Sequence, residues 1–236
     1  EHLNVPGVVK DGSFTVRRGE ILGFCGLIGA GRTETMEALF GYRRKQSGTV
    51  RIDGRTVEIH KPADAIRSGM AFVTEDRKQT GLFLPLDAAD NILMPSLRQY
   101  SAGGLIRNAA FAADSDELIS RLNVKTPSRR QIVDYLSGGN QQKLLLARWM
   151  HRQPEVIILD EPTRGIDVGA KAEIYEMIGR MAQEGRCIIV ISSELPEVMG
   201  ISDTIAVMHD GRLVKTVARA DFDSNVLMQY ATGLNS

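Results

Sequence analysis

The fold is decided by residues 136–167, which read LSGGNQQKLLLARWMHRQPEVIILDEPTRGID. The stretch opens on Ser137-Gly138-Gly139 ahead of a helical run, where the backbone N–H groups of a helix start can meet an anion with no side chain in the way. The apolar strand pattern Val156-Ile157-Ile158-Leu159 follows and ends in Asp160 and Glu161. Because ligands of open α/β sheets bind at the carboxyl ends of strands, the stretch joins two phosphate-handling elements.

The two adjacent carboxylates suit different roles. Mg²⁺ takes hard oxygen ligands and is usually held by one or two carboxylates together with substrate phosphates, which indicates Asp160 as a metal ligand. Glu161 can then polarise a water molecule, so we expect it to be the catalytic residue.

Size and charge limit the classes of protein that fit this chain. Its 236 residues allow one or two subdomains around a sizeable core. Its 29 basic side chains balance 29 acidic ones, so the whole surface carries no electrostatic footprint for nucleic acid. We therefore expect no nucleic-acid partner.

The cysteines and the apolar segments indicate the compartment. Cys25 and Cys187 lie in apolar, strand-like runs, which predicts buried free thiols and a reducing cytosol rather than a disulfide or a metal site. The most apolar segment, residues 21–30, has about half the length needed to cross a bilayer. The chain begins with Glu1 rather than Met, so we expect it to be a piece of a longer polypeptide.

A glycine-rich loop lies near the start of the chain, between the apolar strand pattern Glu20–Cys25 and a helical pattern, Thr33–Phe40. Its spacing is that of the phosphate loop GxxxxGK(S/T), with Arg32 in the lysine position. Thr33 can offer a hydroxyl to Mg²⁺, and Arg32 supplies positive charge, although its planar guanidinium is broader than an ammonium group. The alternative is a tight turn without a ligand. The candidate nucleotide-binding residues of the loop are Gly26, Gly29, Ala30, Gly31, Arg32, Thr33 and Glu34.

The order of the patterns predicts an α/β fold. We expect a strand at Ser13–Val16 and a hairpin, residues 49–59, that extends an antiparallel β edge. Residues 84–131 lack β-rich runs, and helical patterns such as Phe111–Leu122 alternate there with loops, including Gly103-Gly104. Strand and helix patterns alternate again further on. The chain is therefore predicted to be a P-loop NTPase core, 1–83 and 151–236, with a mainly parallel sheet and an inserted helical subdomain, 84–150.

Taken together, these motifs resemble the ATP-binding cassette ATPases over essentially the full chain. The phosphate loop is followed in order by LSGGNQQK (136–143), by the strand that ends in Asp160-Glu161-Pro162, and by Gly165-Ile166-Asp167 in the position of that family's D-loop. The forms SGGNQQK and LDEPTRGIDVGAK look like the sugar-importer ATPases that carry two cassettes in one polypeptide, and most like their C-terminal cassette.

The resemblance implies a function and partners. The chain would bind ATP and Mg²⁺, hydrolyse ATP weakly as an isolated domain, and energise import of a sugar or sugar-like solute. Its partners would be the N-terminal cassette of the same polypeptide, membrane permease subunits and, indirectly, a periplasmic solute-binding protein, at the cytoplasmic face of the inner membrane. Ser137, Gly138 and Gly139 would contact the nucleotide that the partner cassette binds, because cassettes pair head to tail.

Several positions depart from the general cassette pattern. Glu75, in a charge run that is otherwise a solvated surface, occupies the place of the Q-loop glutamine and would face the metal. Ser193 stands where the switch histidine usually contacts the nucleotide, and a hydroxyl supplies no positive charge. No aromatic residue precedes Phe14 to stack on adenine. The alternative is therefore a non-hydrolysing or very slow regulatory half; a cassette acting on nucleic acid is disfavoured by the balanced charge.

Overall fold

The computed structural model describes residues 1–102, 105–106 and 108–234, so the expected Gly103-Gly104 loop lies outside the described residues. The chain divides into two compact units. The first contains Glu1–Phe72, Glu155–Glu161 and the remainder of the chain from Ile178, and the second contains Val73–Pro154 and Pro162–Met177. The second unit thus includes residues 73–83, 151–154 and 162–177 besides the residues 84–150 that were expected as a helical subdomain.

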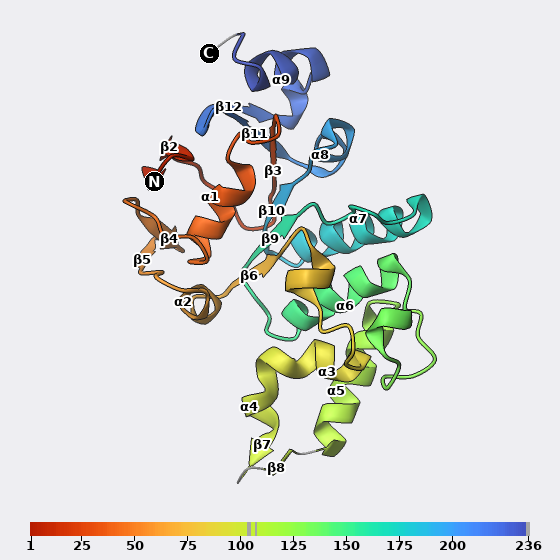
Figure 1. Cartoon of the computed structure of the whole chain (residues 1–236). Coiled ribbons are helices and arrows are strands. Elements are labelled where there is room, and N and C mark those ends of the chain that lie inside the picture. The colour runs from red at the N-terminus through yellow and green to blue at the C-terminus, as the bar shows by residue number, and fades with distance from the viewer. Residues whose placement is uncertain (103–104, 107, 235–236) are drawn as a thin grey trace. The chain divides into compact units, whose positions relative to one another are not determined.

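A six-stranded sheet forms the centre of the first unit, in the order β12-β11-β3-β10-β9-β6 (Figure 1). β11, β3, β10 and β9 run parallel, and β12 pairs antiparallel with β11 at the edge, which confirms the predicted fold class. The strands are β3 Ile21–Gly26, β6 Met70–Val73, β9 Val156–Asp160, β10 Cys187–Ile191, β11 Thr204–His209 and β12 Arg212–Ala218. β9 is buried along its whole length, as its unbroken apolar run requires.

The register of three neighbouring strands aligns their carboxyl ends. Ile191 of β10 pairs with Phe24 of β3 on one side and with Asp160 of β9 on the other. The segments that leave these strands therefore start at the same edge of the sheet.

Two short hairpins accompany the sheet. β1 (Leu3–Val5) pairs antiparallel with β2 (Val9–Gly12), and β4 (Val50–Ile52) with β5 (Arg55–Val57). The β4-β5 hairpin was expected to extend an antiparallel edge, but it forms its own two-stranded sheet. Each of its strands has only three residues, and none of these is buried, so it has little apolar surface to attach it to the larger sheet.

The strand expected at Ser13–Val16 is absent, and these residues have no regular structure. Their alternating apolar pattern has another cause, because the Phe14 ring lies edge-on against Phe24 of β3, with ring centroids 5.0 Å apart. An extended segment that packs apolar side chains on a sheet shows the same two-residue alternation of apolar and polar residues as a strand within the sheet.

The first unit also contains helices and two free cysteines. Cys25 is buried and Cys187 half-buried, and both are free, as the sequence predicts. No helix in the described residues is long and apolar enough to cross a membrane. The helical elements of the first unit are α1 Arg32–Leu39, α2 Pro62–Arg67, α8 Leu195–Ile201, the 3₁₀ turn η4 Arg219–Asp221 and α9 Ser224–Ala231.

The second unit is mainly helical (Figure 1). Its longest helices are α5 Asn108–Arg121 and α6 Gly138–Met150, and α7 Val168–Gln183 begins in this unit and ends in the first. Its shorter elements are η1 Arg77–Gly81, α3 Ala88–Leu93, η2 Met94–Ser96, α4 Leu97–Tyr100, β7 Ser101–Ala102, β8 Leu105–Ile106 and η3 Val133–Tyr135.

A buried arginine joins α6 to α3. Arg148 donates hydrogen bonds to the backbone oxygen of Asn91 at 2.7 Å and to its side-chain oxygen at 3.0 Å. Asn91 in turn bonds both backbone groups of Phe83, as acceptor at 2.8 Å and donor at 2.9 Å. Burial lowers the pKa of Arg148 to about 10, so these acceptors replace the water that the guanidinium loses.

The start of α6 packs closely on α7. A Cβ on Gly139 would lie 2.6 Å from the Cβ of Ala170, far inside van der Waals contact. Gly179, in the middle of α7, has nothing outside its own helix within 4 Å of the equivalent position. Close packing against Ala170 therefore requires glycine at position 139, whereas position 179 has room for a side chain.

We predict that Gly139→Ala lowers the free energy of unfolding by about 1–3 kcal/mol, because overpacking outweighs the gain in helix propensity. Gly179→Ala should raise it by about 0.5–1 kcal/mol. Denaturant unfolding measures both, and Ala170→Gly should partly rescue Gly139→Ala. Equal effects of the two glycine substitutions would contradict the packing argument.

Candidate functional site

The glycine-rich loop joins β3 to α1 in the first unit. A Cβ on Gly26 would lie 2.4 Å from the backbone oxygen of Met208, so only glycine fits where the loop leaves the strand. Gly31, with a φ of 95°, is the N-cap of α1 and provides no side-chain cap. The first N–H groups of a helix have no acceptor within it, so those of Arg32 and Thr33 are available to an anion.

Asp160, at the end of β9, is 1% exposed, and neither of its carboxylate oxygens has a hydrogen-bond partner among the described residues. Burial raises its pKa to about 7; the Thr33 hydroxyl is near enough to oppose this rise but makes no hydrogen bond of normal geometry. A buried carboxylate without a partner is costly, and a cation would offset this cost. The site therefore fits Mg²⁺.

The donor set for such a cation is small. Over residues 1–102, 105–106 and 108–234, no group of three or more His, Cys, Asp and Glu side chains is placed to hold a metal ion. A cation beside Asp160 and Thr33 would depend on oxygens of a bound phosphate for its remaining ligands, as Mg²⁺ commonly does.

Glu161 is held in an unusual backbone conformation. Its φ is 48°, in the left-handed region that non-glycine residues rarely adopt, and its N–H donates to the backbone oxygen of Ile191 at 2.9 Å. Its side chain accepts a hydrogen bond from the Ser193 hydroxyl at 3.2 Å. Burial raises the pKa of Glu161, and the hydrogen bond from Ser193 opposes the rise. A carboxylate held with a raised pKa suits proton transfer.

Arg32 connects the glycine-rich loop to the segment after β10. One guanidinium nitrogen donates to the backbone oxygen of Ser192 at 2.9 Å. The Ser192 hydroxyl donates to the Glu197 carboxylate at 2.8 Å, so its hydrogen is not available to another acceptor. Arginine can hold this carbonyl and still direct its other N–H groups elsewhere, because its donors form a planar fork.

The first unit thus brings together the loop from Gly26 to Glu34, Asp160, Glu161 and Ser193 at the carboxyl edge of β3, β9 and β10. Ser193 was expected to contact nucleotide; here its hydroxyl donates to Glu161, and the nucleotide contact stays a prediction. Glu75 lies in the second unit, where it pairs with Arg164, so its role as a metal ligand stays a prediction.

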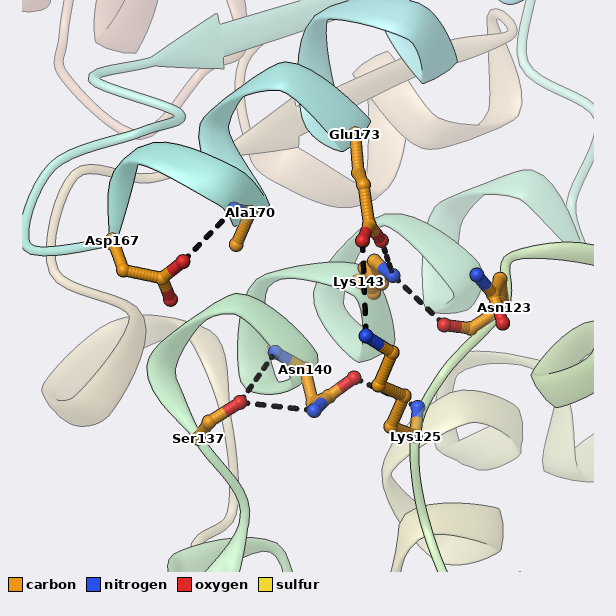
Figure 2. A network of polar contacts seen from close by, with 8 residues as sticks. All are labelled: Asn123, Lys125, Ser137, Asn140, Lys143, Asp167, Ala170 and Glu173. Carbon is orange, nitrogen blue, oxygen red and sulfur yellow. Dashed lines mark hydrogen bonds and ion pairs between the residues drawn. The ribbon is translucent and has the colours of Figure 1, made fainter.

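Ser137, Gly138 and Gly139 also lie in the second unit, at the start of α6. Ser137 is the N-cap, and its hydroxyl accepts hydrogen bonds from the backbone and side-chain N–H groups of Asn140 at 3.4 and 2.9 Å (Figure 2). Beside it is a cavity of about 210 Å³. The lining residues are Lys125, Ser137, Gly139, Asn140, Lys143, Asp167, Gly169, Ala170 and Glu173.

Two further residues here were not recognised from the sequence. Lys143 is 3% exposed; it donates to the backbone oxygen of Asn123 at 2.8 Å and pairs with Glu173 of α7 (Figure 2). Arg77 donates to the backbone oxygens of Arg164 at 2.8 Å and Gly165 at 3.3 Å. Arg77 belongs to a run of charged residues that looks like solvated surface. Lys143 lies on a helix face that no sequence pattern identifies as buried.

The arrangement of strand, glycine loop and helix beside a strand that ends in two acids defines a class of nucleotide-binding proteins. The family model for ABC transporters matches residues 9–164. The chain belongs to this family.

The relatives are import ATP-binding proteins. One from Geobacillus kaustophilus (strain HTA426), described as a putative ribose/galactose/methyl galactoside import ATP-binding protein, is 48% identical over 98% of this chain and 47% of its own length. The ribose import ATP-binding protein RbsA of Lactococcus lactis subsp. lactis (strain IL1403) is 50% identical over 99% of this chain and 47% of its own length. The chain spans about half the length of the curated relatives it matches.

Solved structures support the fold. The structure of cbiO1 from Clostridium perfringens, part of the ABC transporter complex cbiONQ, matches with a TM-score of 0.80 and 20% identity, over 100% of this chain and 93% of that chain. MJ1267, an ATP-binding cassette of an ABC transporter, matches with a TM-score of 0.82 and 17% identity, over 99% and 96%.

We predict that Asp160→Asn stabilises the nucleotide-free protein at alkaline pH. The pKa of this carboxyl group is raised in the folded state, so its cost to stability is absent below about pH 4, grows with pH and is complete above about pH 7. At about 1.4 kcal/mol per pKa unit, the cost is on the order of a few kcal/mol.

Thermal unfolding of both proteins at about pH 5 and pH 8 measures this effect, and the gain from Asp160→Asn should be larger at the higher pH. Mg-ATP should stabilise the wild type more than the variant. A gain that does not depend on pH would show that Asp160 is ionised at no cost.

Proposed function

We propose that this chain is the C-terminal, ATP-hydrolysing cassette of a two-cassette protein that energises import of a sugar or sugar-like solute. One observation carries the proposal. A glycine loop that leaves β3 and two acids that end β9 share one edge of the sheet, and the buried acid has no hydrogen-bond partner among the described residues. The relatives' names support the cargo, and the chain's share of their length supports its being about half of a longer protein. The C-terminal position rests on the resemblance of the sequence motifs.

The loop residues are proposed to bind the nucleotide phosphates. The N–H groups that begin α1 face the anion, and Arg32 adds positive charge while it holds Ser192. Thr33 and Asp160 would hold Mg²⁺, which supplies charge stabilisation on the phosphates when bound.

Glu161 is proposed to accept the proton of the attacking water. Its carboxylate is fixed by the backbone bond to Ile191 and the hydroxyl of Ser193, so it needs little reorganisation. The presence of both acids does not favour the alternative, a non-hydrolysing regulatory half.

Ser137 and the N–H groups of Gly138 and Gly139 are proposed to contact the nucleotide of a partner, the N-terminal cassette of the same polypeptide. Gly139 has a second reason to be glycine, its contact with Ala170, so a substitution there would not test nucleotide contact alone. Membrane permease subunits, and through them a periplasmic solute-binding protein, are the further partners, at the cytoplasmic face of the inner membrane.

We predict that Glu161→Gln lowers single-turnover ATP hydrolysis at this cassette by about a hundredfold or more, because an amide cannot accept the proton. The assay uses the two-cassette protein with the catalytic acid of the N-terminal cassette removed. Mg-ATP binding by calorimetry should change little.

Glu58→Gln is the matched control, since the Glu58 side chain is 88% exposed and should leave hydrolysis unchanged. Wild-type hydrolysis in Glu161→Gln would favour the regulatory alternative, and loss of Mg-ATP binding would assign Glu161 a structural or metal-binding role.

A further inference from the structure

A backbone N–H group determines how the Asn140 side chain is turned. The N–H of Lys125 donates to the side-chain oxygen of Asn140 at 2.8 Å (Figure 2). A backbone N–H can only donate, so the Asn140 amide must turn its oxygen toward Lys125 and its NH₂ group toward Ser137. The orientation of the amide is therefore determined by the main chain.

The orientation of Asn140 determines what the Ser137 hydroxyl can do. The hydroxyl oxygen accepts from the Asn140 NH₂ group at 2.9 Å and from the Asn140 backbone N–H at 3.4 Å. A hydroxyl has two acceptor positions and one hydrogen, so both acceptor positions are occupied and the hydrogen remains to be donated. Within the described residues no acceptor takes it. Ser137 is exposed, and its hydroxyl is thus prepared to donate to a group from outside the chain.

The charges around the adjoining cavity do not by themselves favour an anion. Two lysines, 125 and 143, face two acids, Asp167 and Glu173, and the formal charges cancel. Glu173 is paired with Lys143, and Asp167 accepts the N–H of Ala170 at 3.0 Å. Recognition of an anion therefore depends on the hydroxyl of Ser137 and the N–H groups that begin α6.

Residues 123–125, which include the Lys125 N–H that orients Asn140, are held at both ends by α6. Lys143, one turn along α6, holds the backbone oxygen of Asn123, while Asn140 holds the backbone N–H of Lys125. Glu173 of α7 fixes Lys143 in turn (Figure 2). The same helix face thus holds both ends of residues 123–125, and the donor aimed at Asn140 is kept in place.

We propose that Asn140 is a positioning residue that presets the Ser137 hydroxyl as a hydrogen-bond donor to the terminal phosphate of the partner cassette's nucleotide. The inference rests on the proposed function of Ser137. It adds that the residue after Ser-Gly-Gly acts through its amide polarity, by way of Ser137.

The test reverses that polarity with an isosteric change. In Asn140→Asp, one carboxylate oxygen still accepts from the Lys125 N–H, but the other can only accept, so the Ser137 hydroxyl donates to it and is lost to the phosphate. Half-saturating ATP for hydrolysis by the two-cassette protein should rise on the order of tenfold to a hundredfold. Ser137→Ala should cause a rise of similar size, and the double variant should add little.

The added negative charge needs its own control. Lys125→Gln changes the net charge by the same amount at the neighbouring residue and leaves the backbone N–H of Lys125 bonded to Asn140. It should raise half-saturating ATP only a few fold, and Asn140→Asp should have no larger effect than this once Ser137 is alanine. Slow hydrogen exchange at the Lys125 amide in Asn140→Asp would show that the local fold is intact.

The outcomes separate the inference from the proposed function. No effect of Ser137→Ala means that Ser137 does not contact nucleotide, and the proposed function of this segment fails. The inference alone is overturned if Ser137→Ala raises half-saturating ATP but Asn140→Asp raises it no more than Lys125→Gln does, both with Ser137 present and with alanine in its place.

A measurement on the unaltered chain keeps the inference testable if Asn140→Asp does not fold. The NH₂ group of Asn140 should exchange with solvent more slowly in NMR spectra than that of the exposed Asn225, because it donates to Ser137. Equally fast exchange would mean that the amide is turned the other way, and the inference would be wrong.

Discussion

The candidate nucleotide site of the first unit depends on the parallel register of three strands. Ile191 of β10 stands between Phe24 of β3 and Asp160 of β9, so the segments that carry the glycine loop, the two acids and Ser193 leave the sheet side by side. A slip of one residue would turn every side chain of a strand to the opposite face. Because these strands are buried on both faces, such a slip would force side chains into packed layers that have no space for them; beside Gly23, even a Cβ would lie 2.4 Å from a methyl carbon of Val198. The packed core thus holds the site in register.

This placement has a cost that the fold must offset. Asp160 is buried without a hydrogen-bond partner in the described residues, and Glu161 has a left-handed backbone. Both features destabilise the free protein and both suit the bound state, in which a cation and phosphates would surround the acids. The start of α6 differs, since the Asn140 side chain bonds both the Ser137 hydroxyl and the Lys125 N–H. The buried Lys143 is likewise paired with Glu173 and bonded to the backbone oxygen of Asn123.

Much of the fold and the phosphate-binding loop could be predicted from sequence, because strand and helix periods and glycine spacing are local properties. The strand expected at Ser13–Val16 was wrong, since packing of Phe14 on Phe24 mimics a strand period. The contact between Gly139 and Ala170, and the bond between Asn140 and Lys125, link residues whose proximity no local pattern records. Such side chains are positioned by tertiary packing, which a single sequence does not display.

The central claim is that this chain binds one nucleotide with its glycine loop and contributes Ser137 to another, on the partner cassette. Photo-crosslinked ATP, measured on each half of the two-cassette protein after cleavage between the halves, tests it most directly. We expect Thr33→Ala to lower labelling of this half and Ser137→Ala to lower labelling of the other half. If both substitutions lowered labelling of the same half, the two sites would serve one nucleotide and the claim would be contradicted.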